Sequence, residues 1–121
     1  MTKQEVDKAV KREIARLKKL YQDIDPKEKT IVEGLIVQAA RLRVSLDILW
    51  DDIIDKGDVE LFTQSDKTEP YERERPVARL FNSRDKNYQT IIKQLNDRLP
   101  EDKATDASEE LLSFAFGKKK K

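Results

Sequence analysis

A long segment of helical periodicity, bounded by residues that start and stop helices, dominates the sequence. Asp25 and Pro26 supply a helix N-cap and a proline at the first helical position, and Gly57 is the residue type that closes a helix with a left-handed conformation. Between them, apolar residues recur at helical spacing without an intervening proline. An unbroken helix here would be about 46 Å long at 1.5 Å per residue. We therefore expect the chain to fold around one long central helix.

The apolar face of this central segment is wider than a single partner requires. One row consists of Ile31, Leu35, Leu42, Leu46, Leu49 and Ile53, and a flanking row consists of Val32, Ile36, Ala39, Ala40, Trp50 and Ile54. A helix that is wet on one side needs an apolar stripe of only about 100°. We expect two partners, namely the rest of the subunit and a neighbouring copy. The alternative is one larger core, which is harder to build from 121 residues.

Two shorter helical segments flank the central one. Thr2 and Glu5 form the pattern of a capping box, and apolar residues then recur every three or four positions until about Asp23. Pro76 opens the other segment, whose apolar face continues to about Leu99, where the next residue is a proline. The sequence therefore predicts three principal helices.

The helical period is lost in residues 58–75. Val59 to Gln64 alternate loosely and include good strand formers, and Pro70 would confine a return strand to a sheet edge. We expect a short β-hairpin or an extended excursion there. The fold class is thus mainly α, with residues 1–100 as one helical domain and residues 101–121 as a flexible tail with a short amphipathic segment.

The composition excludes most catalytic chemistry. The chain has no histidine and no cysteine, so it lacks the commonest general base, the commonest transition-metal ligand and any thiol nucleophile. Its three glycines cannot be assembled into a phosphate-binding loop. We expect a protein that is not an enzyme and that uses no cofactor and no metal.

Charge is distributed in blocks, although the net charge is only +1. Residues 1–24 carry seven basic and four acidic side chains, whereas residues 58–75 carry three and six. The basic side chains that share the polar face of the first helix are Lys8, Lys11, Arg12, Arg16 and Lys19. Such a face can contact DNA phosphates, and each neutralised phosphate would release counterions. The alternative, a solvated lysine-rich face, is the commoner case for this feature taken alone.

Two further charged clusters have a structural explanation that we favour. The acidic cluster consists of Asp47, Asp51, Asp52, Asp55 and Asp58. It could hold a divalent cation, contact a basic face of another subunit, or be an unpaired surface patch; no calcium-loop spacing is present, so we favour the last two. Arg73 and Arg75 could clamp phosphates, but we favour ion pairs that tie the hairpin to the helix ends.

The last apolar residues of the chain lie beyond a polar stretch. They are Leu111, Leu112, Phe114 and Phe116, followed by four lysines. Apolar anchors on a polar tether are typical of a segment that folds on binding a partner. Docking back on its own domain is an equal alternative that the sequence does not decide.

Three consecutive segments between Asp25 and about Pro100 carry a resemblance to a known family. They are the run IVEGLIVQAARLRVSLDILWDDI, the helix stop DKGDVELFTQSD and the segment EPYERERPVARLFNSRDKNYQTIIKQLNDRLP, and the stretch from Asp25 to about Pro100 that contains them covers roughly 60% of the chain. This succession resembles the small terminase subunits of tailed bacteriophages, in particular the short type of siphophages of Gram-positive hosts. Many members carry an N-terminal helix-turn-helix domain, whereas residues 1–24 have room for only one helix, so no helix-turn-helix contact is carried over.

The resemblance implies a non-catalytic component of a genome-packaging motor. Such a protein forms a ring of copies, recognises double-stranded viral DNA and delivers it to the large terminase subunit in the host cell cytoplasm. On this basis we expect the basic face of the first helix to contact DNA and the apolar tail residues to contact the large subunit. The residues expected at the interface between copies are Ile31, Leu35, Leu42, Trp50, Ile54, Phe81 and Tyr88.

Two other classes of protein remain open. A small helical transcriptional regulator or adaptor, dimeric, would share the basic helix but would need a recognition helix, for which there is no clear candidate. A purely structural head-assembly protein would make no nucleic-acid contact. No stretch approaches the roughly 18 apolar residues of a membrane span, so we expect no membrane partner.

Overall fold

The computed structural model describes residues 1–100, which form three helices and a two-stranded antiparallel hairpin. The helices are α1 (Lys3–Leu20), α2 (Lys29–Lys56) and α3 (Pro76–Asp97), and the strands are β1 (Val59–Phe62) and β2 (Tyr71–Glu74). The expectation of a mainly α fold with a hairpin between the second and third helices is confirmed. The expected C-terminal tail and its amphipathic segment lie outside the described residues.

Helix α1 begins where its capping box predicts. The Thr2 side chain accepts a hydrogen bond from the Glu5 amide, and the Glu5 carboxylate accepts one from the Thr2 amide. The helix ends at Leu20, three residues before the expected end at Asp23. A turn through Tyr21 then leads towards α2.

The start of α2 differs from the expectation in detail. The Asp25 side chain caps the backbone amide of Lys27 as expected, but Pro26–Glu28 form a 3₁₀ turn and the α-helix itself begins at Lys29. At the other end, Gly57 has the expected positive φ of 81°. Its ψ of 176° is extended rather than left-handed helical, so the residue turns the chain directly from α2 into β1.

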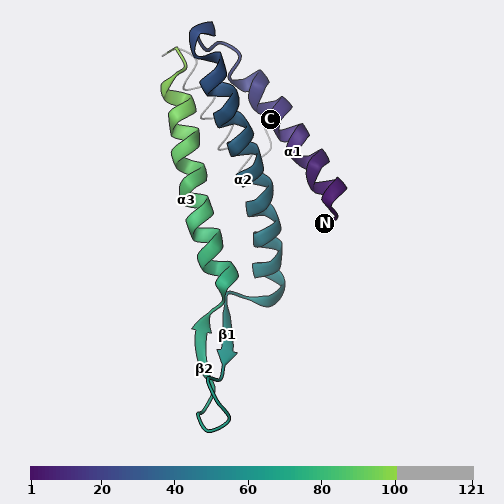
Figure 1. Cartoon of the computed structure of the whole chain (residues 1–121), viewed down its shortest axis with the longest axis vertical. Coiled ribbons are helices and arrows are strands. Elements are labelled where there is room, and N and C mark those ends of the chain that lie inside the picture. The colour runs from purple at the N-terminus through teal and green to yellow at the C-terminus, as the bar shows by residue number, and fades with distance from the viewer. Residues whose placement is uncertain (101–121) are drawn as a thin grey trace, which may run out of the picture.

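Helices α2 and α3 lie antiparallel and side by side, and the hairpin projects beyond them at one end (Figure 1). The strands pair in the register Val59 with Glu74 and Phe62 with Tyr71. Pro70 directly precedes β2, in agreement with its expected place at a strand edge. No third strand pairs with the hairpin within residues 1–100, so both of its outer edges lack a β partner there.

The main core lies at the end of the molecule opposite the hairpin. It consists of Leu17, Tyr21, Val32, Ile36, Ala39, Ala40, Leu95 and Leu99. Helix α1 packs on α2 at this end and diverges from it (Figure 1). With 18 residues α1 is about 27 Å long, whereas the 28 residues of α2 span about 42 Å. The part of α2 nearest the hairpin is therefore not covered by α1.

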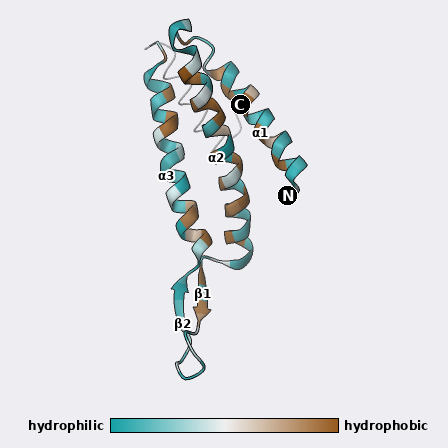
Figure 2. Cartoon of the chain, in the orientation of Figure 1, coloured by the Kyte–Doolittle hydropathy of each residue, from teal (hydrophilic) through white to brown (hydrophobic). Residues whose placement is uncertain are grey.

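The hydropathy of the elements follows this arrangement. Helix α2 is largely hydrophobic along its length, β1 is hydrophobic and β2 is hydrophilic (Figure 2). Beyond the main core, Val44 and Leu46 of α2 and Ala78 of α3 are also buried. None of the helices within residues 1–100 is long and apolar enough to cross a membrane.

Candidate functional site

The outer face of α1 presents cations that have no partner in the part of the chain that the structure describes. Lys8, Lys11, Arg12 and Lys19 are all exposed, whereas Leu17 on the opposite face is completely buried. None of the four forms an ion pair within residues 1–100. They are therefore available to an anion outside the subunit. We call these four residues the α1 basic face.

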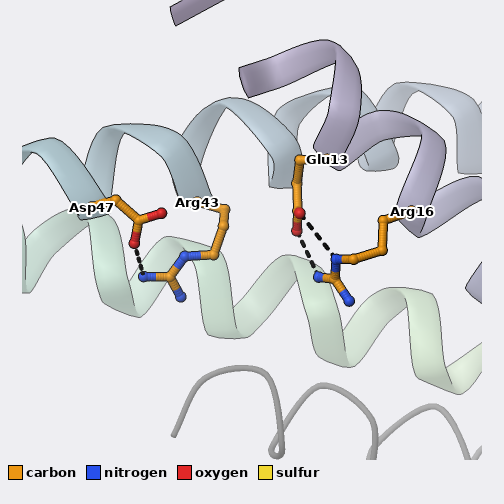
Figure 3. A network of polar contacts seen from close by, with 4 residues as sticks. All are labelled: Glu13, Arg16, Arg43 and Asp47. Atoms are coloured by element: carbon orange, nitrogen blue, oxygen red, sulfur yellow. Dashed lines mark hydrogen bonds and ion pairs between the residues drawn. The ribbon is translucent and has the colours of Figure 1, made fainter. Parts of the chain in front are cut away.

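Arg16, the fifth cation expected on this face, points towards the protein. Its Nε and Nη2 atoms lie 3.0 and 2.6 Å from the two carboxylate oxygens of Glu13, and Glu13 is only 7% exposed (Figure 3). A bidentate pair of this kind is a strong charge-assisted contact. Arg16 thus serves the packing of α1, and the DNA-binding hypothesis keeps only the other four cations.

A layer of polar contacts continues from this pair across the helices. Arg43 of α2 donates to Asp47 at 3.0 Å (Figure 3), and its guanidinium lies 5.2 Å from the ring centroid of Tyr88 on α3. The Tyr21 hydroxyl donates to Asn96 Oδ1 at 2.7 Å, which links the end of α1 to α3. The layer therefore links α3 both to α2 and to the end of α1.

Burial raises the pKa of the two tyrosines in this layer. Desolvation is the largest cause for Tyr21, and the proximity of Tyr88 raises its pKa further, while Arg16 opposes the shift. Desolvation is also the largest cause of the raised pKa of Tyr88, with Arg43 opposing it. Both phenols therefore stay protonated at neutral pH and act as packed hydrogen-bonding groups rather than as acids or bases.

Exposed apolar residues gather at the hairpin end of the molecule. Trp50 is 50% exposed and Ile54 67%, and on the hairpin Leu61 is 72% exposed. Val59 and Leu80 are also exposed. We call these five residues the hairpin-end surface. Large apolar side chains left exposed at one end of the molecule, where α1 does not cover α2, are candidates for an interaction surface.

The residues expected at an interface fall into two groups. Ile31, Trp50 and Ile54 are exposed, and half-buried Phe81 contacts Trp50 with ring centroids 5.7 Å apart. Leu35 and Tyr88 instead pack against the core of their own subunit, and Leu42 is half-buried. The sequence reasoning missed Val59, Leu61 and Leu80. The alternation of residue types in β1 could have placed Val59 and Leu61 on one face of the hairpin. Their exposure could not have been predicted, because it depends on the projection of the hairpin beyond the helices.

Arg73 and Arg75 make the structural ion pairs that we favoured for them. Arg75 donates to the Gly57 carbonyl at 2.6 Å and to Asp52 at 3.0 Å, so it ties the start of α3 to the end of α2. Arg73 lies 2.8 Å from Glu60 on the paired strand and 3.6 Å from the ring centroid of Phe62. Within residues 1–100, no group of three acidic side chains is arranged to hold a metal ion.

Comparisons with known proteins assign no relative to the chain. No family model matches it, and neither a curated protein nor a solved structure matches it. The features that bear on function are therefore the α1 basic face, the hairpin-end surface and the resemblance of residues 25–100 to small terminase subunits.

Proposed function

We propose that the protein is a small terminase subunit of a tailed phage, a non-catalytic DNA-recognition and regulatory component of the packaging motor. The observation that carries this proposal is the α1 basic face, four exposed cations without an ion-pair partner in residues 1–100 on one side of a helix. Binding to double-stranded DNA through backbone phosphates needs little more than such an array. The packaging role comes from the resemblance of residues 25–100 to that family.

The second part of the proposal is a ring of identical subunits. Its support is the hairpin-end surface, because a stable interface between proteins typically buries roughly 800 Å² per partner with an apolar centre. A contact between different patches of identical copies can close into a ring. In this arrangement the hairpin-end surface of each copy contacts a different face of the next copy, while α1, which packs near the other end of α2, stays accessible to DNA (Figure 1).

The remaining parts of the proposal concern partners. The large terminase subunit would supply the ATPase and nuclease activities, and the apolar residues of the tail would contact it. The absence of histidine and cysteine from the chain is in keeping with a role that involves no catalysis. The expected place of action is the host cell cytoplasm.

The α1 basic face is tested by the salt dependence of DNA binding. The test variant replaces Lys8, Lys11, Arg12 and Lys19 with Ala, and the control replaces Lys27, Arg41, Lys67 and Lys86, which are exposed elsewhere on the subunit, with Ala. Both variants remove four positive charges. The affinity of each for a duplex of viral packaging-site sequence is measured by fluorescence anisotropy at several salt concentrations.

We expect only the α1 variant to bind weakly. The slope of log K against log salt should fall by about 0.9 for each phosphate that is no longer neutralised. The control should lose a little affinity, because its net charge is lower by four, but it should keep most of the slope of log K against log salt. Unchanged affinity and slope in the α1 variant would show that DNA, if bound at all, contacts another surface.

A further inference from the structure

A groove lies at the edge of the core, where the end of α1, the following turn and the start of α2 meet. It has a volume of about 440 Å³, within the roughly 300–1,000 Å³ of pockets that take small ligands. Its apolar walls are formed by Tyr21, Ile24, Pro26, Val32 and Ile36. The groove is therefore a small apolar site, next to the buried core, that can take a few apolar side chains.

The rim of the groove is charged. Lys18 and Lys29 stand on it and are exposed, and neither forms an ion pair within residues 1–100. Glu33 also lies on the rim, is exposed and is likewise without an ion pair there. Because two cations and one anion stand on this rim, a matching occupant has apolar anchors next to acidic groups.

One segment of this chain has that pattern. Glu109 and Glu110 directly precede the apolar anchors Leu111, Leu112, Phe114 and Phe116, and a run of four lysines follows. The acidic pair matches Lys18 and Lys29 on the rim. We propose that residues 109–116 dock in this groove of their own subunit.

The position of the described chain end makes the docking feasible. Leu99 belongs to the same core cluster as Tyr21, Val32 and Ile36, so the chain leaves the described part beside the groove. The ten residues from 101 to 110 can span up to roughly 33–36 Å when extended, which is longer than α1. A linker of this length also keeps the apolar tail residues at an effective concentration in roughly the millimolar range around the groove. Weak contacts are therefore enough to keep the tail docked.

Docking in the groove has a regulatory consequence. The anchors that dock are the residues assigned to the large terminase subunit, and one set of side chains cannot occupy both sites. The docked tail is thus unavailable to the large subunit until the large subunit competes with the groove for the same side chains. This consequence rests on the proposed function, whereas the docking itself does not.

The docking is tested by photo-crosslinking of the full chain. Phe114 is replaced by benzoylphenylalanine, the protein is irradiated, and the products are separated on a denaturing gel and mapped by mass spectrometry. We expect a product of monomer mass with the crosslink within residues 18–36. A covalent dimer, or a crosslink elsewhere in the subunit, would overturn the proposal.

Charge reversal on the rim supplies a second readout that does not depend on the probe position. The double variant Lys18→Glu and Lys29→Glu should lower the crosslink yield several-fold because the tail acids then meet like charges. The matched control, Lys67→Glu and Lys86→Glu, changes residues outside the groove and should leave the yield unchanged. Equal yields in the two variants would contradict the charge matching. Failure of both tests would leave the DNA-binding proposal standing, because the α1 basic face is not part of the groove.

Discussion

At the scale of single residues, Glu13 and Arg16 show how a charge pattern on a helix can mislead. Helical spacing groups Arg16 with the outward cations of α1, yet its side chain pairs with Glu13, which is buried. A buried carboxylate on the inner side of α1 gives this arginine an ion-pair partner, which the cations further round the helix lack within residues 1–100. Spacing alone does not reveal this, because the burial of Glu13 depends on how α1 lies on α2.

The first prediction concerns this pair. Glu13→Gln removes the charge while keeping the shape, and we expect the free energy of unfolding to fall by about 1–3 kcal/mol because a part-buried arginine loses its charged partner. Glu33→Gln, at an exposed position of α2, should change it by less than about 0.5 kcal/mol. Urea unfolding measures both. A loss at Glu13 no larger than that at Glu33 would mean that the pair contributes nothing net to stability.

The second prediction follows from the raised pKa of Tyr21. In the unfolded chain this phenol ionises near its ordinary pKa of 10.0, whereas in the folded protein burial keeps it protonated to higher pH. The unfolded state therefore releases the proton first, so stability is fully present below pH 10 and is lost as the pH rises above it. Tyr21→Phe should shrink the fall in the urea midpoint between about pH 9 and pH 11. The control Tyr71→Phe, at an exposed position, should not, and an equal fall in wild type and Tyr21→Phe would refute the assignment.

At the scale of elements, the boundaries predicted from the sequence were those set by local chemistry. The capping box at Thr2, the Asp25 cap, Pro76 at the start of α3 and the positive φ of Gly57 are all properties of a few neighbouring residues. The features that could not be predicted depend on distant contacts. The hydrogen bond from Tyr21 to Asn96 joins residues 75 positions apart, and it lies at the point where α1 ends earlier than its periodicity suggests.

The third prediction contrasts two glycines of the same helical region. Gly57 has φ 81° and ψ 176°, a conformation that residues with a Cβ rarely adopt, so Gly57→Ala should destabilise the protein by about 1–3 kcal/mol. Gly34 lies inside α2, and a Cβ there would meet nothing within 4 Å, so Gly34→Ala should stabilise it by about 0.5–1 kcal/mol. Thermal unfolding distinguishes them. The same sign for both changes would contradict the backbone argument.

At the scale of the whole molecule, the wide apolar face of α2 is buried at one end of the helix and exposed at the other. Near the core end, Val32 and Ile36 are buried among α1, α2 and α3. Near the hairpin, Trp50 and Ile54 remain exposed because α1 is too short to reach them. The sequence predicted that the apolar face of α2 is wider than one partner needs. It could not show which apolar residues pack within the subunit and which remain for a neighbouring copy. That division depends on where α1 packs.

The fourth prediction tests the hairpin-end surface. Ile54→Ser with Leu61→Ser changes two exposed side chains, so the fold should remain while self-association weakens at least tenfold, since about 1.4 kcal/mol of lost apolar burial corresponds to a factor of ten. Gln64→Ser with Glu69→Ser, exposed polar residues of the same hairpin, is the control. Circular dichroism checks the fold and sedimentation velocity the association. Association that survives in the Ile54 and Leu61 variant would place the interface elsewhere.

The native mass of the full chain tests the central claim, that this subunit works in a closed ring, most directly. Light scattering on a sizing column at two protein concentrations gives this mass without reference to DNA or to the large subunit. The account predicts one species of many subunits whose mass does not change on dilution, because a closed ring leaves no free interface. A monomer at both concentrations would contradict the ring, and a dimer at both would contradict it in favour of a helical DNA-binding regulator.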